Sequence, residues 1–560
     1  MVSYYDKLSQ ERKDLQEKDL LPNWFSTGGY QLFKDKYLWA TTPREQYETI
    51  AATLAAHTND APAWKEKFFN LLWKGWLSPS TPVLSNTGTT RGLPVSCGGS
   101  YIEDSIDGFY SARRETALLT KHGFGTSGYL GDVRSRGSSI SVGGKASGIM
   151  PVLRGFVQDS RDVSQGSARR GAWAGYIPID HNDFDEVITH LEKEPDDVNI
   201  GWNISNEWLD KLNAGDKEAR SRFSKALKVK LVTGKGYFWF PDKANHKLPT
   251  YYPITNKASN LCSEILLPSD KDHTFTCVLS SMNLAKYDEW KDTDAVFDAT
   301  VFLDCVASEF IVKARSIPGL EKAVRFTEKA RALGLGTAGF HTYLQEHMMS
   351  LDSMDAHYFN HEVFEHMFKE SLRASQWMAK EWGAPEWSDG SVRNCSRLAV
   401  APTKSTALIM GGISEGINPD PAMVYTQSTA GGEVARIVPT LLRLMKERGV
   451  YDKAHINEIV DKFGSVQDVD WLSAEEKLVF RTAFEYDQNV LVRLASARAA
   501  YLDQWQSVNL FFSAKEDPKV IVDVHRNAFN DDNILGLYYI YSQAGVAASK
   551  DRNVDCEACS

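Results

Sequence analysis

The sequence has few cysteines and no excess of positive charge. Seven cysteines in 560 residues is a sparse and odd number, which excludes the disulfide framework of a small secreted protein. The net charge is −10, so the chain lacks the general basic surface that holds a nucleic-acid backbone. The charge does not exclude local binding sites for free nucleotides. Without a disulfide framework, the role of each cysteine must be considered separately.

Long apolar runs are also missing. No segment approaches the roughly 18 consecutive apolar residues that a membrane span needs. The amino-terminal segment mixes both charge signs and lacks the apolar stretch of a signal peptide. Hydrophobic residues make up 42% of the chain and charged residues 24%, as in a large globular protein. We therefore expect a cytoplasmic protein with no membrane or nucleic-acid partner.

The periodicity of apolar residues predicts a mixed α/β body. A capping box at Ser473–Glu476 predicts a further helix that runs to about Ala500. Between the helical segments, a region rich in Gly, Ser and Thr over 78–175 is typical of loops that approach a ligand. The predicted helices are 44–57, 63–76, 205–230 and 355–382, and the predicted strands include 236–240 and 260–267.

Several cysteines have contexts that suit redox chemistry. In a strand, Asn260, Cys262 and Glu264 would project to one side, which sets a thiol between an amide and a carboxylate. Cys97 and Cys277 also lie in strand-like segments that could meet across a core. The simpler alternative is that these cysteines only pack, as we expect for Cys305 and Cys395.

The carboxyl terminus carries a CxxC motif at Cys556 and Cys559. A dithiol on a flexible tail suits thiol–disulfide exchange. Zinc binding would need two further ligands nearby, and an inert terminus is the other alternative.

Three further motifs are weak on their own. The GxGxxG strings at Gly123–Gly128 and Gly334–Gly339 do not follow a convincing strand, so a dinucleotide site is disfavoured. Hydroxyls at the start of a helix over 402–406 could hold a phosphate or simply cap the helix. Adjacent tyrosines at Tyr538 and Tyr539 would ordinarily be core aromatics.

Taken together and in this order, the motifs resemble the large, catalytic subunit of class I ribonucleotide reductases. The resemblance spans about residues 80–560. It implies that Cys262 forms a thiyl radical flanked by Asn260 and Glu264, and that Cys97 and Cys277 form the reducing pair. It further implies that Tyr538 and Tyr539 relay a radical and that Cys556 and Cys559 shuttle electrons to the site.

The resemblance also implies binding sites for substrate and effector. Thr81 and Ser96 would contact the substrate. Asp104 and Arg134 would form the effector site, and Gln165 and Arg169 would lie in the loop that reports the effector to the substrate pocket. The residues implied for the substrate phosphates are Pro402, Thr403, Lys404, Ser405 and Thr406.

The implied fold is a ten-stranded α/β barrel of two parallel five-stranded halves around a central finger loop. We expect an N-terminal helical region at 1–85, the barrel at 86–545 and a flexible redox tail at 546–560. Only 96 residues precede Cys97, and most are needed for the helical region. We therefore expect the family's ATP cone to be absent.

The implied partners are a radical-generating small subunit with a metallocofactor, and thioredoxin or glutaredoxin. The chain itself would hold no cofactor for chemistry, but would bind a ribonucleotide substrate and a nucleoside triphosphate effector, with or without Mg²⁺, and form an effector-promoted homodimer. Two alternatives stay open. One is a class II reductase that uses adenosylcobalamin, and the other is a non-catalytic nucleotide-binding regulatory protein.

Overall fold

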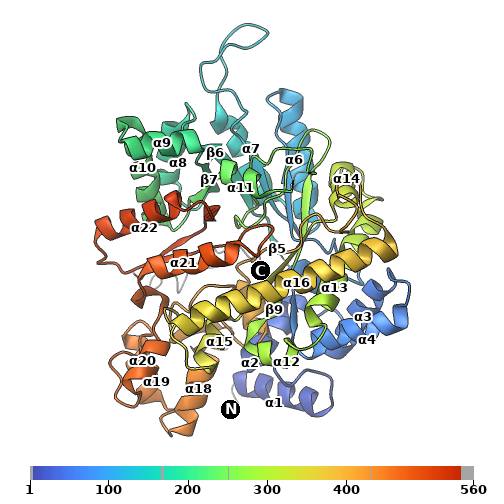
Figure 1. Cartoon of the computed structure of the whole chain (residues 1–560), viewed down its shortest axis with the longest axis vertical. Helices are drawn as coiled ribbons and strands as arrows, with labels where there is room; N and C mark the ends of the chain where they lie inside the picture. Colours follow the sequence, from blue (N-terminus) through green and yellow to red (C-terminus); the bar gives the residue numbers. More distant parts are fainter. Residues whose placement is uncertain (1–3, 166–168, 250, 430–431, 544–560) are drawn as a thin grey trace.

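The computed structural model describes residues 4–165, 169–249, 251–429 and 432–543. Its largest sheet has nine strands within these residues, in the order β1-β9-β2-β3-β6-β7-β8-β14, with β10 also paired to β9. Helices surround this sheet on its flanks (Figure 1). None of the helices in these ranges is long and apolar enough to cross a membrane.

Five strands of this sheet are parallel neighbours and form its first half. These strands are β2 (Cys97–Ser100), β3 (Gly125–Tyr129), β6 (Trp173–Pro178), β7 (Asn199–Asn203) and β8 (Tyr237–Trp239). Helices connect them in turn, as parallel strands require: α6 (Ile106–Lys121), α7 (Ile149–Asp162), α8 (Phe184–Lys193), α9 (Asn206–Ala214) and α10 (Lys217–Thr233). The expected parallel five-stranded half is therefore present.

The second half of the sheet is less regular. Strands β9 (Phe275–Asn283) and β10 (Leu333–Ala338) are parallel, and a separate two-stranded sheet pairs β13 (Leu510–Phe512) in parallel with β15 (Ile540–Ser542). Between these pairs lie only single parallel bridges, Leu335 to Leu398 and Val400 to Gln506. The α/β class is confirmed, but ten regular strands are not found in the described part of the chain.

Antiparallel contacts join the two halves. β2 pairs with β9, β8 pairs with β14 (Gly536–Leu537), and β1 (Leu77–Pro79) adds to β9. Short two-stranded ribbons complete the strand set: β4 (Ser164–Gln165) with β5 (Arg169–Arg170), and β11 (Val424–Thr429) with β12 (Gly432–Ile437).

The remaining helices lie before and after the first half. The N-terminal group is α1 (Tyr4–Glu17), α2 (Thr27–Leu32), η1 (Phe33–Tyr37), α3 (Pro43–Ala55), α4 (Ala61–Trp73) and α5 (Thr81–Asn86). The central group is α11 (Pro241–Lys247), η2 (Leu284–Lys286), α12 (Tyr287–Trp290), α13 (Ala295–Ala314), α14 (Glu321–Ala330), α15 (Phe340–Glu346) and α16 (Met354–Trp382). The last group is α17 (Lys404–Ile409), α18 (Pro439–Glu447), α19 (Lys453–Asp461), α20 (Ala474–Val479), η3 (Ala483–Glu485), α21 (Gln488–Ala499) and α22 (Pro518–Asn530).

The helices predicted over 44–57, 63–76 and 355–382 are confirmed as α3, α4 and α16, whereas the segment predicted over 205–230 divides at Gly215, φ 85°, into α9 and α10. The Ser353 hydroxyl accepts the backbone N–H of Ala356 and begins α16, which ends before Gly383 at φ 86°. In Figure 1, α16 (yellow) crosses the molecule between the N-terminal helices (blue) and α21 and α22 (red).

The helix predicted from Ser473 to about Ala500 is wrong in its length. The capping box at Ser473 is present, but α20 ends at Val479. A second capping box at Thr482 and Glu485 then starts a 3-10 turn, and the Asp487 carboxylate caps α21. Competing caps inside the segment therefore divide it into three short helices.

The strand predicted over 260–267 is also wrong, because this segment is a loop. Ser263 has φ 66°, in the left-handed region that extended strands do not use. Side chains, rather than a neighbouring strand, form hydrogen bonds with the backbone of Ile265. The Asn260 Oδ1 accepts the Ile265 N–H at 3.2 Å, and the Ser259 hydroxyl donates to the Ile265 carbonyl at 2.7 Å. The backbone is thus satisfied without a ladder.

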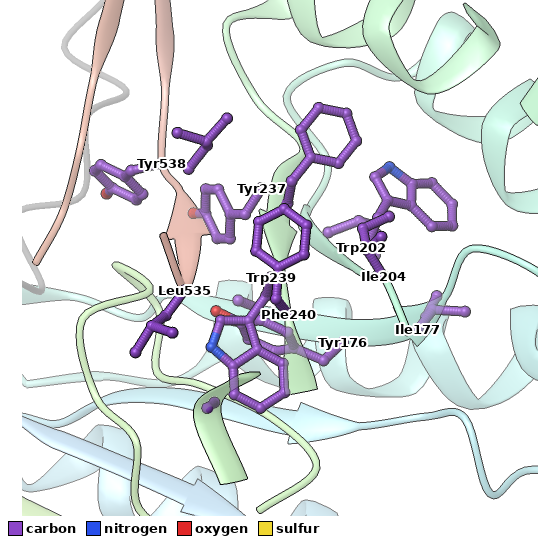
Figure 2. Packing of buried hydrophobic residues seen from close by; sticks show 14 of the residues in the cluster. Tyr176, Ile177, Trp202, Ile204, Tyr237, Trp239, Phe240, Leu535 and Tyr538 are labelled. Carbon is purple, nitrogen blue, oxygen red and sulfur yellow. The ribbon is translucent and has the colours of Figure 1, made fainter. Parts of the chain in front are cut away.

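This finger loop, residues 259–267, lies inside the first of two large hydrophobic cores. That core contains residues of the five parallel strands together with Cys262. Figure 2 shows Leu535 and Tyr538 in the same core. The second core joins the N-terminal helices to α13 and α16. The finger loop is therefore buried within this core.

Candidate active site

Two cysteines face each other across the junction of the two sheet halves. Cys97 begins β2, and its Cα partner in the antiparallel pairing with β9 is Cys277. Both side chains are fully buried and present as thiols. Directly opposed residues on paired strands bring their Cβ atoms to about 4.5–5.5 Å, so oxidation to a disulfide needs little backbone movement.

Neighbouring amides hold these sulfurs. The Asn260 Nδ2 donates to the Cys97 Sγ at 3.3 Å, and the Gln504 Nε2 approaches the Cys277 Sγ at 3.6 Å. Burial raises the pKa of Cys277 well above its ordinary value, and the Gln504 contact opposes this shift. Cys277 is therefore held as a protonated thiol that can give up a proton and an electron.

The second GxGxxG string has a structural explanation at this pair. Its residues form β10 rather than a nucleotide loop, beside β9. A Cβ at Gly334 would lie 2.4 Å from the Leu279 Cδ2 and 3.1 Å from the Cys277 Sγ. Glycine is thus required because β10 packs closely against the thiol-bearing strand.

Cys262 lies at the turn of the finger loop and contacts the tyrosine pair. Its Sγ is 3.1 Å from the phenolic oxygen of Tyr538, although the two residues are 276 positions apart. The ring of Tyr538 lies 4.0 Å from that of Tyr539, centroid to centroid. Tyr538 is 2% exposed and Tyr539 is 9% exposed. These aromatic groups therefore form a continuous path from Cys262 toward the edge of the core.

A further aromatic ring packs against this path. Tyr237 on β8 lies 5.0 Å from Tyr538 and 5.8 Å from Tyr539, between ring centroids. Figure 2 shows Tyr538 beside Tyr237, with Trp239 and Tyr176 farther along the same core. The Tyr176 hydroxyl donates to the backbone carbonyl of Asn260 at 2.6 Å and so supports the finger loop.

Glu264 is a fully buried carboxyl group on the same loop. Burial raises its pKa to about 7, against hydrogen bonds from its own backbone, Asn260 and Ser507 that lower it. The Ser507 hydroxyl lies 3.2 Å from the Glu264 Oε2 and 2.7 Å from the carbonyl oxygen of Cys262. A carboxyl group poised near neutral pH can accept and return a proton during one reaction cycle.

The phosphate candidates lie at the start of α17. Pro402 precedes Thr403, which has φ 59° and accepts the N–H of Gly416 on its Oγ1 at 2.8 Å. Lys404 and Ser405 open the helix, and the Thr406 hydroxyl donates to the Thr403 carbonyl at 3.2 Å. Thr403 gives α17 no side-chain cap.

A short chain of amides runs from the same loop toward the tyrosine pair. The Asn418 Oδ1 accepts the N–H of Asn509 at 3.2 Å, and the Asn509 Oδ1 accepts the N–H of Tyr539 at 3.2 Å. Asn418 also donates to the carbonyl of Ser507 at 3.4 Å. The loop that carries Gly416 is therefore linked to the segment behind Glu264.

The two other substrate candidates, Thr81 and Ser96, are both buried. The Thr81 Oγ1 lies 3.3 Å from the Tyr37 hydroxyl. Ser96 directly precedes Cys97, and its hydroxyl has no hydrogen-bond partner among the described residues.

Two of the effector candidates, Asp104 and Arg134, form a partly exposed ion pair. The Arg134 Nε donates to the Asp104 Oδ2 at 2.7 Å, and Arg134 also donates to the carbonyl of Ser139 at 3.3 Å. Gln165 and Arg169 are register partners in the β4–β5 ribbon. Cys556 and Cys559 lie outside the described residues.

Several residues of the site were not identified from the sequence. Gln504, Ser507 and Asn509 contact the thiol pair, Glu264 and Tyr539 through one buried segment. The alternating polar residues just before the apolar strand β13 were the available signal. The histidines His357 and His361, by contrast, lie on α16 with rings 5.0 Å apart and take no part in this cluster.

The cluster can combine one-electron and two-electron chemistry. A tyrosine next to a thiol can exchange a hydrogen atom with it, a facing thiol pair can give two electrons, and a buried carboxyl group can move a proton. Because the core excludes water, reactive intermediates are protected there.

Comparison with known proteins agrees with this chemistry. The chain matches the model of the ribonucleotide reductase barrel domain over 95–217, 206–391 and 386–540, and that of the all-alpha domain over 23–92. The solved class Id ribonucleotide reductase alpha subunit of Actinobacillus ureae superposes with a TM-score of 0.86 and 35% identity, covering 96% of this chain and 99% of that one.

Curated relatives carry the same description. The ribonucleoside-diphosphate reductase large subunit of Invertebrate iridescent virus 3 is 28% identical over 96% of this chain and 98% of its own length. The corresponding Caenorhabditis elegans subunit is 26% identical over 90% of this chain and 74% of its own length.

Proposed function

This chain belongs to the family of ribonucleotide reductase large subunits, and we propose that it reduces ribonucleoside diphosphates through a thiyl radical on Cys262. The observation that carries this proposal is the 3.1 Å contact between the Cys262 Sγ and the Tyr538 hydroxyl, next to the facing pair Cys97 and Cys277. A hydrogen atom that moves from the thiol to a tyrosyl radical creates the thiyl radical without a cofactor in this chain.

The first step on the substrate is removal of a hydrogen atom. The Cys262 thiyl takes the 3′ hydrogen of the ribose, and Glu264 accepts the proton of the 3′ hydroxyl. The raised pKa of Glu264, about 7, supports this role because the group can hold and release a proton near neutrality. Asn260 orients the substrate while it also donates to the Cys97 Sγ.

The second step removes the 2′ hydroxyl. The Cys97 and Cys277 pair supplies two protons and two electrons and becomes a disulfide. One proton converts this hydroxyl to water, the other together with the two electrons forms the new C2′–H bond, and Glu264 returns its proton to the 3′ oxygen. Cys262 returns its hydrogen to C3′, which regenerates the thiyl radical. The balance is one ribonucleotide and two thiols giving one deoxyribonucleotide, one water and one disulfide.

The disulfide must be reduced before the next turnover. Cys556 and Cys559 would do this by thiol–disulfide exchange and would in turn be reduced by thioredoxin or glutaredoxin. These reductants are abundant in a reducing cytoplasm, which is where we place the enzyme.

The radical comes from a partner. The class Id relative supports a radical cofactor in a small subunit, from which Tyr539 and Tyr538 carry the radical to Cys262. A class II enzyme would generate the thiyl from adenosylcobalamin in one chain and would need no tyrosine pair at this position.

Nucleotide binding is assigned to two sites. The loop from Pro402 to Thr406, with Thr81 and Ser96, would hold the substrate. Asp104 and Arg134 would bind a nucleoside triphosphate effector, with Gln165 and Arg169 in the loop that changes substrate preference. Effector binding would promote a homodimer by mass action. The proposed parts are the helical region 1–85, the barrel 86–545 and the redox tail 546–560.

The decisive experiment uses the full chain, CDP and an effector, with either a radical-loaded class I small subunit or adenosylcobalamin. Wild-type chain should form dCDP only with the small subunit, and Cys262→Ser should form none. Cys305→Ala is the matched control, because Cys305 is buried on α13 in the other core. Turnover by Cys262→Ser would refute the thiyl assignment, and activity with the cobalamin alone would refute the partner assignment.

A further inference from the structure

A fully buried lysine contacts the backbone of the tyrosine relay. Lys230 lies near the end of α10 and is 0% exposed. Its ammonium group donates to the carbonyl oxygen of Tyr538 and, at 2.7 Å, to that of Gly236. Burial lowers the pKa of Lys230 well below its ordinary value. Desolvating a lysine at such a position is costly. This cost points to a role for the two backbone segments whose carbonyl groups accept its hydrogen bonds.

The two acceptors belong to the two segments that carry adjacent aromatic rings. Gly236 directly precedes Tyr237 on β8, and the Tyr237 ring lies 5.0 Å from that of Tyr538. The same segments meet again where the N–H of Ile540 donates to the carbonyl of Gly234 at 3.1 Å. One ammonium group therefore fixes the spacing between the strand behind the relay and the relay itself.

Tyr538 lies outside the regular strands. It falls between the short strands β14 and β15, outside both. Its N–H donates to the carbonyl of Val508 at 2.8 Å, and its carbonyl is held by Lys230. The N–H and the carbonyl of Tyr538 are therefore both hydrogen-bonded. Its phenolic oxygen lies 3.1 Å from the Cys262 Sγ.

We propose that Lys230 is a positioning residue for radical transfer between Tyr538 and Cys262. This inference rests on the proposed function, in which Tyr538 passes the radical to Cys262. Hydrogen transfer between two heavy atoms depends steeply on their separation, so a small shift of the Tyr538 backbone slows the step without touching substrate binding. Lys230 touches neither substrate nor the reacting atoms and acts through Tyr538.

A second lysine provides a matched control. Lys243 on α11 is 8% exposed, and its ammonium group donates to the carbonyls of Phe529 at 2.7 Å and Asp531 at 2.8 Å. It also links this part of the chain to the C-terminal segments, but it holds no residue of the relay. Loss of Lys243 therefore reproduces the loss of a buried lysine–carbonyl contact without moving Tyr538.

The test compares Lys230→Met, Lys230→Gln and Lys243→Met in the full chain with a radical-loaded small subunit. We expect Lys230→Met to lose at least about 30-fold in dCDP turnover, Lys230→Gln to lose less because an amide donor remains, and Lys243→Met to stay within about threefold of wild type. The KM for CDP should stay unchanged in all three. If Lys230→Met does not fold, Lys230→Gln decides, with an expected loss of at least about fivefold.

A spectroscopic measurement separates positioning from stability. With 3-aminotyrosine at position 538, the trapped radical should show altered β-methylene hyperfine couplings in Lys230→Gln, because these couplings report the orientation of the ring relative to its backbone. Lys243→Met should leave them unchanged. Unchanged couplings in Lys230→Gln, or equal losses of turnover in the Lys230 and Lys243 variants, would overturn the inference.

The proposed function can fail separately. Turnover by Tyr538→Phe would refute the tyrosine relay itself. An inactive Tyr538→Phe together with fully active Lys230 variants would refute only the role of Lys230.

Discussion

The facing cysteine pair and the finger-loop cysteine are held in place in different ways. Cys97 and Cys277 lie on paired strands, where the backbone ladder sets their separation. Cys262 lies on a loop whose position depends on side chains such as Asn260, Ser507 and Tyr538. A ladder suits a pair that closes into a disulfide and reopens in the proposed cycle, whereas a loop can bring a cysteine to a tyrosine from a distant part of the chain.

This comparison predicts that loss of the Tyr538 phenol, which contacts Cys262, has the largest effect on turnover. Tyr538→Phe keeps the ring packing but removes the oxidisable phenol, so dCDP turnover should fall by at least about a thousandfold. Nucleotide affinity and thermal stability should change little. Tyr252→Phe is the control, because Tyr252 is also a buried phenol but lies against Ser396, outside the relay. Preserved turnover with lowered stability in Tyr538→Phe would indicate a packing role only.

Loss of either cysteine of the facing pair, Cys97 or Cys277, should block the reaction at a later stage. Cys97→Ser or Cys277→Ser leaves Cys262 able to start the reaction but removes the two-electron reductant, so sustained turnover should drop by at least about a hundredfold. Rapid-freeze EPR should show loss of the small-subunit radical on addition of CDP without matching dCDP. Multiple turnovers by either variant would exclude the pair as reductant, and Cys305→Ala should behave as wild type.

Glu264 tests the proton chemistry of the loop. Glu264→Gln keeps the shape but cannot accept a proton, so turnover should fall by about a hundredfold or more. In wild type, kcat/KM for CDP should rise with pH through an apparent pKa near 7, because the carboxylate form accepts the 3′ hydroxyl proton. The rise should be absent in the residual activity of Glu264→Gln.

The same group should affect stability in a defined direction. Its folded pKa of about 7 lies above the unfolded value, so the folded chain keeps a proton that the unfolded chain releases. The free energy of unfolding, relative to Glu264→Gln, should therefore decrease as pH rises from about 4.5 to 7, by about 3 kcal/mol in total. Chemical denaturation at several pH values measures this, and an increase over that range would contradict the assignment.

The smallest expected effect concerns the backbone of the loop. Ser263 is held at φ 66°, where a β-branched side chain is strained. Ser263→Val should lower the free energy of unfolding by about 1–3 kcal/mol, whereas Ser263→Gly should change it by less than about 1 kcal/mol. Urea titration compares the two. Equal stability of both variants would show that the loop relaxes out of this conformation.

Much of the chemistry could be predicted because it depends on residue type and order. The resemblance named the cysteines, the flanking Asn260 and Glu264 and the adjacent tyrosines as candidates, and the structure places Cys262 against Tyr538 and Cys97 opposite Cys277. The helix start at Ser473 could also be predicted, since a cap is satisfied within three residues. The strand predicted for the finger loop was wrong, because an apolar run does not reveal that side chains from elsewhere will replace a ladder.

The sequence by itself determined which reactive groups this protein carries and where its capped helices begin, since both are local properties. The tertiary structure alone decided which groups meet. Tyr538 reaches Cys262 across 276 positions, and Lys230 reaches the backbone of Tyr538 across 308. It also decided the pKa of Glu264, because the shift comes from burial by segments far away in the chain. Contacts and desolvation of this kind arise only when distant segments pack together, and no local pattern encodes them.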